Sequence, residues 1–523
     1  MQNNKKKRKS TIIIIRYFCA ENEDYGTDAY TILGMTRLEL PTYGYCPDEG
    51  NRLLLCPIWQ QAMESDIRRR LNDNQVLKTK TMNATAKNSI LVTAMLVAVT
   101  PLFAQVNAVD SVMEYSSGKR LSVGGYGEVA MSRNFYSDNI YRYSKASQYK
   151  DDPSHGRFDI PHAVVYLGYD FGKGWTMGTE IEFEHTGTGS AVEQEFEEAG
   201  EWEQEVEKGG EVELEQFWIQ KSFSKQFNLR VGHIVVPVGL NNSRHEPLNF
   251  FTVYRPEGEN TILPSTWHDT GVSLWGRVGD FKYEVEVVAG LDAFKFRRDN
   301  WVKSGAGSAF EYKVANKYGF AARIDNYTIP GLRIGLSGYY GKSMHNTYPH
   351  DMEGTNVNGE KKAYDNVKGN VAIGSIDFTF KRFNWIVRGQ ADYGYVGDAA
   401  TINNIKRTRA KVSNSPYSSM PVGKNAVAIG IEAGYDIFSQ FAKLRERQKF
   451  YLFGRYDHYD SYIPSKEQQA YDFTQKDIVT LGVNYHPIPQ IAVKADYSLR
   501  MLKSQYNNEP SINIGIAYEG FFL

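Results

Sequence analysis

From residue 120 to the C-terminus, apolar and polar residues alternate along the chain in a long series of short runs. In one of these runs, Leu332, Ile334 and Leu336 alternate with Arg333 and Ser337. Successive side chains of a β-strand point to opposite faces, so this period of two residues indicates strands whose faces meet different surroundings. An apolar face opposite a charged face, repeated from run to run, suggests lipid on one side and water on the other, because a charge facing mid-bilayer costs about 2–4 kcal/mol.

Sixteen such runs are predicted as strands, and the connections between them alternate between short and long. The predicted strands cover residues 120–133, 158–171, 174–187, 210–224, 226–236, 269–279, 280–291, 314–328, 331–344, 369–382, 383–397, 424–438, 447–460, 474–486, 490–502 and 510–523. Short turns at one end and long loops at the other are typical of an outer-membrane barrel. We therefore predict an all-β fold, a transmembrane antiparallel β-barrel of sixteen strands over residues 120–523.

One long connection, residues 237–268, differs from the others in composition. Pro237 ends an alternating run, and the loop that follows is rich in Asn, His, Arg, Pro and aromatic residues. Loops of this length inside a compact domain are usually functional. Because the loop is only mildly charged and carries many aromatic side chains, we expect it to fold back into the barrel and narrow it.

The same region resembles a known family. The order LEQFWIQKSFS, FNLRVGHIVVPVG, HEPLNFFTVYRPEG and HDTGVSLWGRVGDFKYEVEVVAGLDA, over roughly 215–291, is similar to the phosphate-selective porin O and P family of outer-membrane β-barrel channels. The resemblance implies a water-filled pore for the passive diffusion of small hydrophilic solutes, and the family's name points to anions such as phosphate. It also implies a Gram-negative outer membrane, with lipid around the barrel, and a homotrimer.

Composition agrees with a barrel. The chain contains 35 Tyr, 27 Phe and 46 Gly, and it has no apolar run of the ~18 residues that a membrane helix needs. The formal net charge of −1 gives no sign of nucleic-acid binding. The final run, INIGIAYEGFFL, resembles the C-terminal strand that the barrel-assembly machinery recognises, although Leu523 stands where that signal usually has Phe.

The first part of the chain does not share this pattern. Residues 82–104 contain a Lys, about ten apolar residues, a Pro and a final Ala, which is the pattern of a secretory signal peptide. We predict cleavage after Ala104, with Ala108 as the alternative, and a short periplasmic segment over 105–119. Residues 1–81, which hold all three cysteines, are predicted to be a disordered upstream extension that results from a start assigned too early.

Basic residues mark the candidate pore. The predicted constriction residues, all in or next to the long loop, are Arg244, His245, Arg255 and His268. The predicted lumen residues, all on the polar faces of strands, are Arg230, Arg323, Arg333, Arg388, Lys494 and Arg500. In porins of the resembling family, inward Arg and Lys guide anions, and basic side chains match phosphate well. The alternative is that these residues form salt bridges in the lumen with Glu180, Glu182, Glu284, Glu286 and Asp325.

An acidic run works against an anion channel. Residues 193–215 hold eleven Glu and one Lys. Such a run is usually a solvated loop, but next to a pore mouth it would repel anions. A divalent-cation site among these carboxylates is a further alternative.

Catalytic motifs are weak. HEPLN at 245–249 lacks the second His of a zinc-protease helix, and His155, His162 and His185 are scattered. We therefore predict no enzyme activity, no cofactor and no metal. Two alternatives to a porin stay open, namely a structural or adhesin-like barrel without an open pore and, behind it, a barrel enzyme.

Overall fold

The computed structural model describes residues 120–522, with gaps at 186–189, 197–201, 209–210, 265, 308–311, 347–365, 411–418 and 467. In the first 119 residues it describes four short strand pieces, β1 (Asp28–Ala29), β2 (Leu38–Glu39), β3 (Tyr45–Pro47) and β4 (Leu53–Leu55). Apart from these pieces, the predicted upstream extension, signal peptide and periplasmic segment lie outside the described residues.

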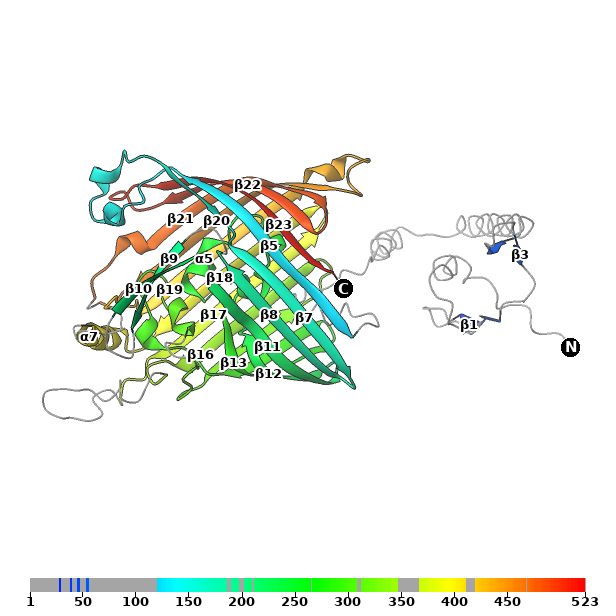
Figure 1. Ribbon diagram of the computed structural model, residues 1–523, viewed down its shortest axis with the longest axis horizontal. Helices are drawn as coiled ribbons and strands as arrows, with labels where there is room; N and C mark the ends of the chain where they lie inside the picture. The colour runs from blue at the N-terminus through cyan, green and yellow to red at the C-terminus, as the bar shows by residue number, and fades with distance from the viewer. Residues whose placement is uncertain are drawn as a thin grey trace, which may run out of the picture. The chain divides into compact units, whose positions relative to one another are not determined.

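Apart from one separate hairpin, the described strands after residue 120 form a closed antiparallel barrel with sixteen strand positions, as predicted (Figure 1). The strands are β5 (Leu121–Asn134), β6 (His155–Asp159), β7 (His162–Gly172), β8 (Trp175–Glu184), β11 (Glu211–Ser224), β12 (Phe227–Val235), β13 (His268–Val278), β14 (Phe281–Val288), β15 (Gly319–Asn326), β16 (Leu332–Lys342), β17 (Asn370–Arg382), β18 (Trp385–Val396), β19 (Asn425–Asp436), β20 (Lys449–Ile463), β21 (Gln475–Ile488), β22 (Ile491–Met501) and β23 (Glu509–Phe521). β23 pairs with β5 and closes the ring.

Two of these strands share one position. β6 and β7 both pair with β5, one with its second half and one with its first. Ile160 and Pro161 separate them. Proline has no backbone N–H to donate to a strand ladder, so a break at this residue is expected.

The predicted facing of the strands is confirmed by the exposed fractions of their side chains. Leu336 and Ile376 point outward and are 58% and 54% exposed. Their neighbours Ser337 and Asp377 point into the barrel and are buried. The outer surface is thus an apolar band around a polar interior, which is the arrangement of a transmembrane barrel.

Aromatic rings collect at the short-turn end of this band. Trp175, Phe223, Phe227, Phe383 and Trp385 all lie beside short turns, and all are well exposed. Amphipathic and aromatic rings favour the interface between lipid and water. Among the described residues, no helix has both the length and the apolar character needed to cross a membrane.

The connections between the barrel strands carry the remaining elements. These are the hairpin β9 (Ser190–Phe196) and β10 (Trp202–Lys208), the helices α5 (Glu257–Ile262) and α7 (Ala399–Arg409), and the 3-10 helices η1 (Ile140–Tyr143), η2 (Ala146–Tyr149), η3 (Asn242–Arg244), η4 (Pro247–Asn249), η5 (Ala293–Lys295), η6 (Lys303–Ala306), η7 (Ile437–Gln440) and η8 (Asp472–Thr474). The hairpin of β9 and β10 lies in the acidic run.

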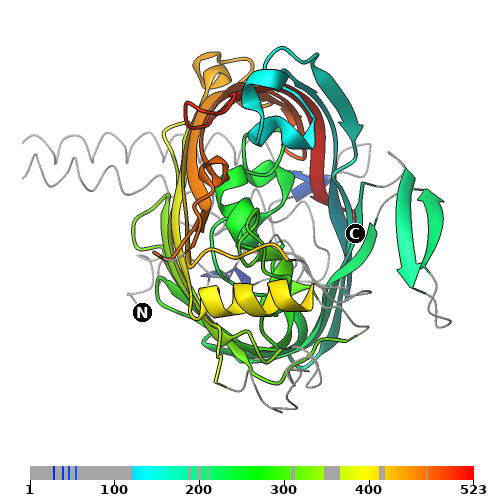
Figure 2. The ribbon, with the colours of Figure 1, turned by 90° about the vertical axis from the view of Figure 1, so that its left-hand side faces the viewer.

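The loop between β12 and β13, which we call the pore loop (residues 236–267), lies inside the barrel, as predicted. Figure 2 shows its helical segments within the ring of strands. α5 contacts β19 and β20, and η4 contacts β5 and β23. The loop also carries apolar side chains that are buried, among them Leu240, Phe251, Val253 and Trp267. The aromatic residues that set this loop apart in the sequence therefore pack inside the barrel.

Candidate functional site

The pore loop is held from one side by β22. The ammonium group of Lys494 donates hydrogen bonds to the backbone carbonyls of Pro247, Phe250 (2.9 Å) and Thr252 (3.0 Å). Two residues further along the same strand, the carboxylate of Asp496 accepts a hydrogen bond from the backbone N–H of Val253 (2.7 Å). Hydrogen bonds to charged groups contribute about 1.5–3 kcal/mol each, so these contacts fix the middle of the loop against the wall.

The start of the loop is held from β15 and β16. Arg323 donates a hydrogen bond to the carbonyl of Gly239 (2.9 Å), and the N–H of Gly239 donates to the hydroxyl of Ser337 (3.1 Å). Gly239 has φ +89°, and a Cβ there would lie 2.2 Å from the carboxylate of Glu259. Only glycine suits this backbone and this space.

Glu259 in α5 closes the loop on itself. Its carboxylate accepts hydrogen bonds from the backbone N–H groups of Leu240 (3.1 Å), Asn241 (2.8 Å) and Asn242 (3.3 Å). The side chain is buried, so these three donors compensate for the loss of water. Sequence reasoning missed this residue, because nothing in the local sequence links a Glu to donors some eighteen positions earlier.

Arginines on β18 and β20 share one carboxylate. Arg388 and Arg455 lie directly opposite Glu432 on its two neighbouring strands. Arg388 Nε lies 2.7 Å and Arg455 Nη1 lies 3.2 Å from the Glu432 oxygens. Asp457 takes a further hydrogen bond from Arg455 (2.6 Å). All four side chains are buried.

A second ion-pair group lies beside the first, on β15–β17. Arg323 Nη2 lies 2.9 Å from Asp325 and 2.9 Å from Asp377, and Arg333 Nη1 lies 2.7 Å from Asp325. Gly335 faces this group, and a Cβ there would lie 2.4 Å from Arg323 Nη2. We call the surface made by both groups, over β15–β20, the arginine wall.

The opposite side of the lumen is acidic. Glu128, Glu180, Glu182 and Glu215 point inward from β5, β8 and β11 and are buried. We call this surface the acidic wall. Arg255 of the pore loop reaches it, with Nη2 3.1 Å from the hydroxyl of Tyr126 and 3.9 Å from a Glu182 oxygen.

His245 also reaches the acidic wall. Its Nε2 lies 3.3 Å from Glu180 Oε1. Burial favours the neutral imidazole, but Glu246 and the bond to Glu180 offset this and raise the pKa of His245 to about 9. The pKa of the preceding residue, Arg244, shifts in the direction that disfavours its charge. Burial, and to a lesser extent the positive charge of Arg333, lower the pKa of Arg244 to about 10. Arg244 is thus influenced by the arginine wall, and His245 and Arg255 by the acidic wall.

The remaining predicted residues also lie in the lumen. Arg230 is stacked on Trp218, with its guanidinium carbon 4.5 Å from the ring centroid, and lies 4.0 Å from Glu284. Arg500 forms an ion pair with Glu257 of α5. His268 packs against His233, with ring nitrogens 2.5 Å apart, and lies 3.8 Å from Glu213.

The structure therefore brings most of the ten predicted basic residues into contact with the pore loop or with acidic partners. The alternative interpretation was salt bridges in the lumen with Glu180, Glu182, Glu284, Glu286 and Asp325. Contacts with these partners are made by Arg230, Arg255, Arg323, Arg333 and His245. Arg388 pairs instead with Glu432. The acidic partners Asp377 and Glu432 and the second arginine, Arg455, were missed, although each lies at an inward position of an alternating run. The alternation could have found these residues but not their pairing.

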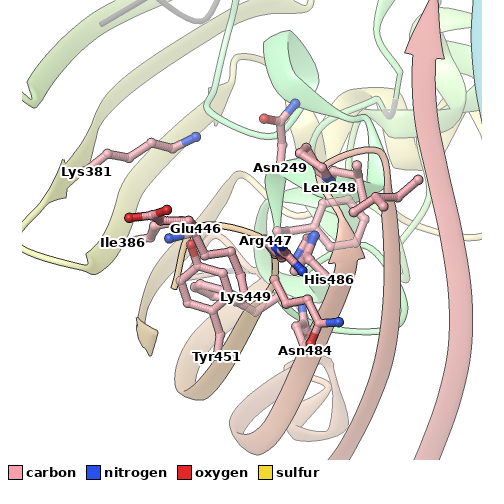
Figure 3. Close-up of a pocket in the computed structure, with 15 residues that line it drawn as sticks. Leu248, Asn249, Lys381, Ile386, Glu446, Arg447, Lys449, Tyr451, Asn484 and His486 are labelled. Carbon is pink, nitrogen blue, oxygen red and sulfur yellow. The ribbon is translucent and has the colours of Figure 1, made fainter. Parts of the chain in front are cut away.

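A cavity of about 300 Å³ lies between the pore loop and the short-turn end of β17–β21. Figure 3 shows Lys381, Arg447, Lys449 and His486 around it, with Glu446 as an acidic neighbour. Leu248, Phe250 and Phe251 of the pore loop line its other side. The space under the loop thus has more basic than acidic side chains in its lining.

Comparisons with known proteins leave the family open. No family model matches the chain. An uncharacterized protein of Aquifex aeolicus (strain VF5) is 28% identical over 399 residues, which cover 76% of this chain and 79% of that protein.

Solved structures similar to this chain are outer-membrane barrels. They include an anion-selective porin from Comamonas acidovorans (10% identity, 76% of this chain and 99% of that chain, TM-score 0.43) and the outer-membrane channel DcaP of Acinetobacter baumannii (11%, 76% and 97%, TM-score 0.42). OprB of Pseudomonas putida is similar at 10% identity over 78% of this chain and 96% of that chain, with a TM-score of 0.43. Similarities of this strength do not indicate a function. The fold is assigned from the strand pairing described above.

Proposed function

We propose that the protein is an outer-membrane porin that lets small hydrophilic solutes diffuse passively through its barrel. The observation that carries this proposal is the pore loop, which lies inside an apolar-coated barrel of sixteen strands and is held there by Lys494 and Arg323. Barrels of about this size leave an aqueous channel, and a loop fixed in the lumen would set its width.

The charges along the lumen support a weak preference for anions such as phosphate. Arg244 and Arg255 are carried by the pore loop, and the cavity beneath it is lined by several basic side chains. The salt bridges of the arginine wall and the carboxylates of the acidic wall work against this preference. A fixed charge at a narrow, poorly hydrated point acts with little screening, so the loop arginines should dominate the selectivity.

The rest of the proposal follows from the chain's resemblance to porins. The barrel would be inserted by the barrel-assembly machinery, which would recognise β23, and its long loops would face the outside. A homotrimer agrees with the resemblance. We propose no catalytic step, and no cofactor is needed for passive diffusion.

The test is electrical. The protein reconstituted in a planar bilayer should show conductance steps, and the reversal potential in a salt gradient should indicate weak anion preference. Arg244→Gln combined with Arg255→Gln should shift the reversal potential toward cations. The matched control removes Arg142 and Arg407, which lie in outer loops, and should shift it less.

Two results would contradict the proposal. A folded protein without conductance steps would favour the structural or adhesin-like barrel. A reversal potential that favours cations at every salt concentration, and that the pore-loop variants leave unchanged, would show that the loop is not the constriction and that the likeness to phosphate-selective porins misleads.

A further inference from the structure

Three side chains meet where the pore loop touches the acidic wall. Glu180 of β8, Glu215 of β11 and His245 of the pore loop each offer one ligand atom, and these atoms lie within 4.8 Å of one another. All three residues are buried. A divalent metal ion at about 2.0–2.2 Å from each ligand needs ligand atoms no more than about 4.4 Å apart, so the three side chains would close slightly around it.

A β-bulge places Glu215 in this group. The register between β11 and β8 shifts between Leu214 and Gln216, so Glu215 is the extra residue. Leu214 points outward and is 49% exposed, whereas Glu215 and Gln216 are both buried in the lumen. A regular strand would have turned one of these two polar side chains toward lipid. Bulges commonly re-aim side chains at functional sites, and here the bulge adds a carboxylate.

Glu215 lacks the partners that a buried carboxylate requires. Both of its oxygens are buried, and among the described residues no basic or amide group donates a hydrogen bond to them. The polar side chain that Glu215 interacts with is the carboxyl group of Glu182, which is itself acidic. The side chain is only 1% exposed. An ionised carboxylate without a partner in such surroundings is costly, and buried charges in proteins are usually paired or bound to a metal.

The other two ligands are already oriented by neighbours. His245 Nδ1 lies 3.1 Å from the backbone carbonyl of Asn242, to which its N–H can donate. Nε2 faces Glu180 Oε1 at 3.3 Å. A metal ion at Nε2 would have to displace the proton that His245 shares with Glu180 in the metal-free protein. Gln216 donates a hydrogen bond to the other oxygen of Glu180. Metal-binding histidines characteristically donate their second ring N–H to a carbonyl or carboxylate in this way.

The charges around Glu180, Glu215 and His245 also favour the binding of a cation. Glu182 of β8 lies directly opposite Glu213 of β11, and like charges at opposed positions destabilise a strand pair. From the pore loop, Arg255 and His245 reach this wall. A neighbouring group, His162 with Glu182 and Glu184, is different, because His162 Nδ1 already pairs with Glu182 at 2.5 Å.

We propose that Glu180, Glu215 and His245 bind one divalent transition-metal ion, which fastens the pore loop to the barrel wall. One imidazole with two carboxylates suits zinc and similar first-row ions, whereas magnesium and calcium prefer oxygen ligands alone. The site goes beyond the proposed porin function, since metal binding can be measured whether or not the barrel conducts.

The experiment uses the full folded barrel in detergent after treatment with a chelator. Zinc is titrated calorimetrically, and cobalt is titrated by its visible absorption. Wild-type protein should bind one zinc per chain, with no competition from equimolar magnesium or calcium. Glu215→Gln and His245→Gln should each weaken zinc binding at least about tenfold, because each removes a ligand. The matched control is Glu286→Gln, since Glu286 on β14 is also a buried carboxylate without a hydrogen-bond donor among the described residues.

Folding of each variant is checked by the shift of the unheated band on a gel. If Glu215→Gln does not fold, His245→Gln decides, because His245 lies in the loop rather than in a strand. The proposal is overturned if the wild-type barrel binds no zinc, if either folded ligand variant binds zinc as tightly as the wild type, or if Glu286→Gln loses zinc to the same extent.

Discussion

The two walls of the lumen are both built from antiparallel strands, but they differ in the charges of their cross-strand neighbours. On the arginine wall, Glu432 lies directly between Arg388 and Arg455 on adjacent strands, so each charge meets its opposite. On the acidic wall, Glu182 lies opposite Glu213. Cross-strand neighbours stabilise a sheet when their charges are opposite and destabilise it when they are alike.

This difference separates charges that hold the barrel from charges that remain available to a ligand. The arginines of the arginine wall are committed to Asp325, Asp377, Glu432 and Asp457. The carboxylates of the acidic wall exceed the cations that the pore loop brings to them. A basic residue that points into the lumen is therefore weak evidence for an anion path. A carboxylate that points into the lumen and receives no hydrogen bond from a basic or amide group is stronger evidence for a cation-binding site.

The largest effect should come from breaking the arginine wall. Glu432→Gln leaves Arg388 and Arg455 buried without their shared counter-charge, and removal of one partner of a buried ion pair costs about 3–5 kcal/mol. We expect a large fall in the urea concentration at which the folded band disappears on an unheated gel. The control is Arg388→Ala, after which Glu432 keeps Arg455 (3.2 Å), so the loss should be smaller. Equal losses would show that the shared carboxylate is not central.

An intermediate effect should follow from crowding the same wall. A Cβ at Gly335 would lie 2.4 Å from Arg323 Nη2 and 2.8 Å from Asp325 Oδ1, so Gly335→Ala must displace the ion pairs. Overpacking of this kind costs about 1–3 kcal/mol. Gly374→Ala on the neighbouring strand is the control, because a Cβ there meets no atom within 4 Å. If the two substitutions lower the urea concentration of unfolding equally, Gly335 is not needed for the ion pairs.

The smallest effect, with the opposite sign, is expected on the acidic wall. In the presence of a chelator, Glu215→Gln removes a buried carboxylate without a donor and relieves repulsion from Glu180 and Glu182. We expect stability to stay constant or to rise by up to about 1 kcal/mol, measured by the same urea titration. If Glu215→Gln lowers the stability as much as Glu432→Gln does, the two walls do not differ in how their charges contribute to stability.

Much of the fold could be predicted from the sequence, because alternation is a local signal. The strand positions and the facing of Leu336 against Ser337 were correct, and so was the inward pore loop. The candidate site was only partly predictable. The alternation identifies Arg388 and Arg333 as inward, but it cannot say which carboxylate each one meets. The adjacent polar residues Glu215 and Gln216 are a visible interruption of the alternation, and only the strand register shows it to be a bulge.

By itself, the sequence determined which residues face lipid, which face the lumen, and where the chain turns, since each depends on neighbours a few positions away. The tertiary structure decided which charges neutralise one another and what holds the pore loop. Lys494 and Phe250 are 244 residues apart, yet they form a hydrogen bond across the closed barrel. Barrel closure and register bring such residues together, and they depend on all sixteen strand positions at once. The ligand group of Glu180, Glu215 and His245 exists for the same reason, because two strands and an inward loop must meet before it forms.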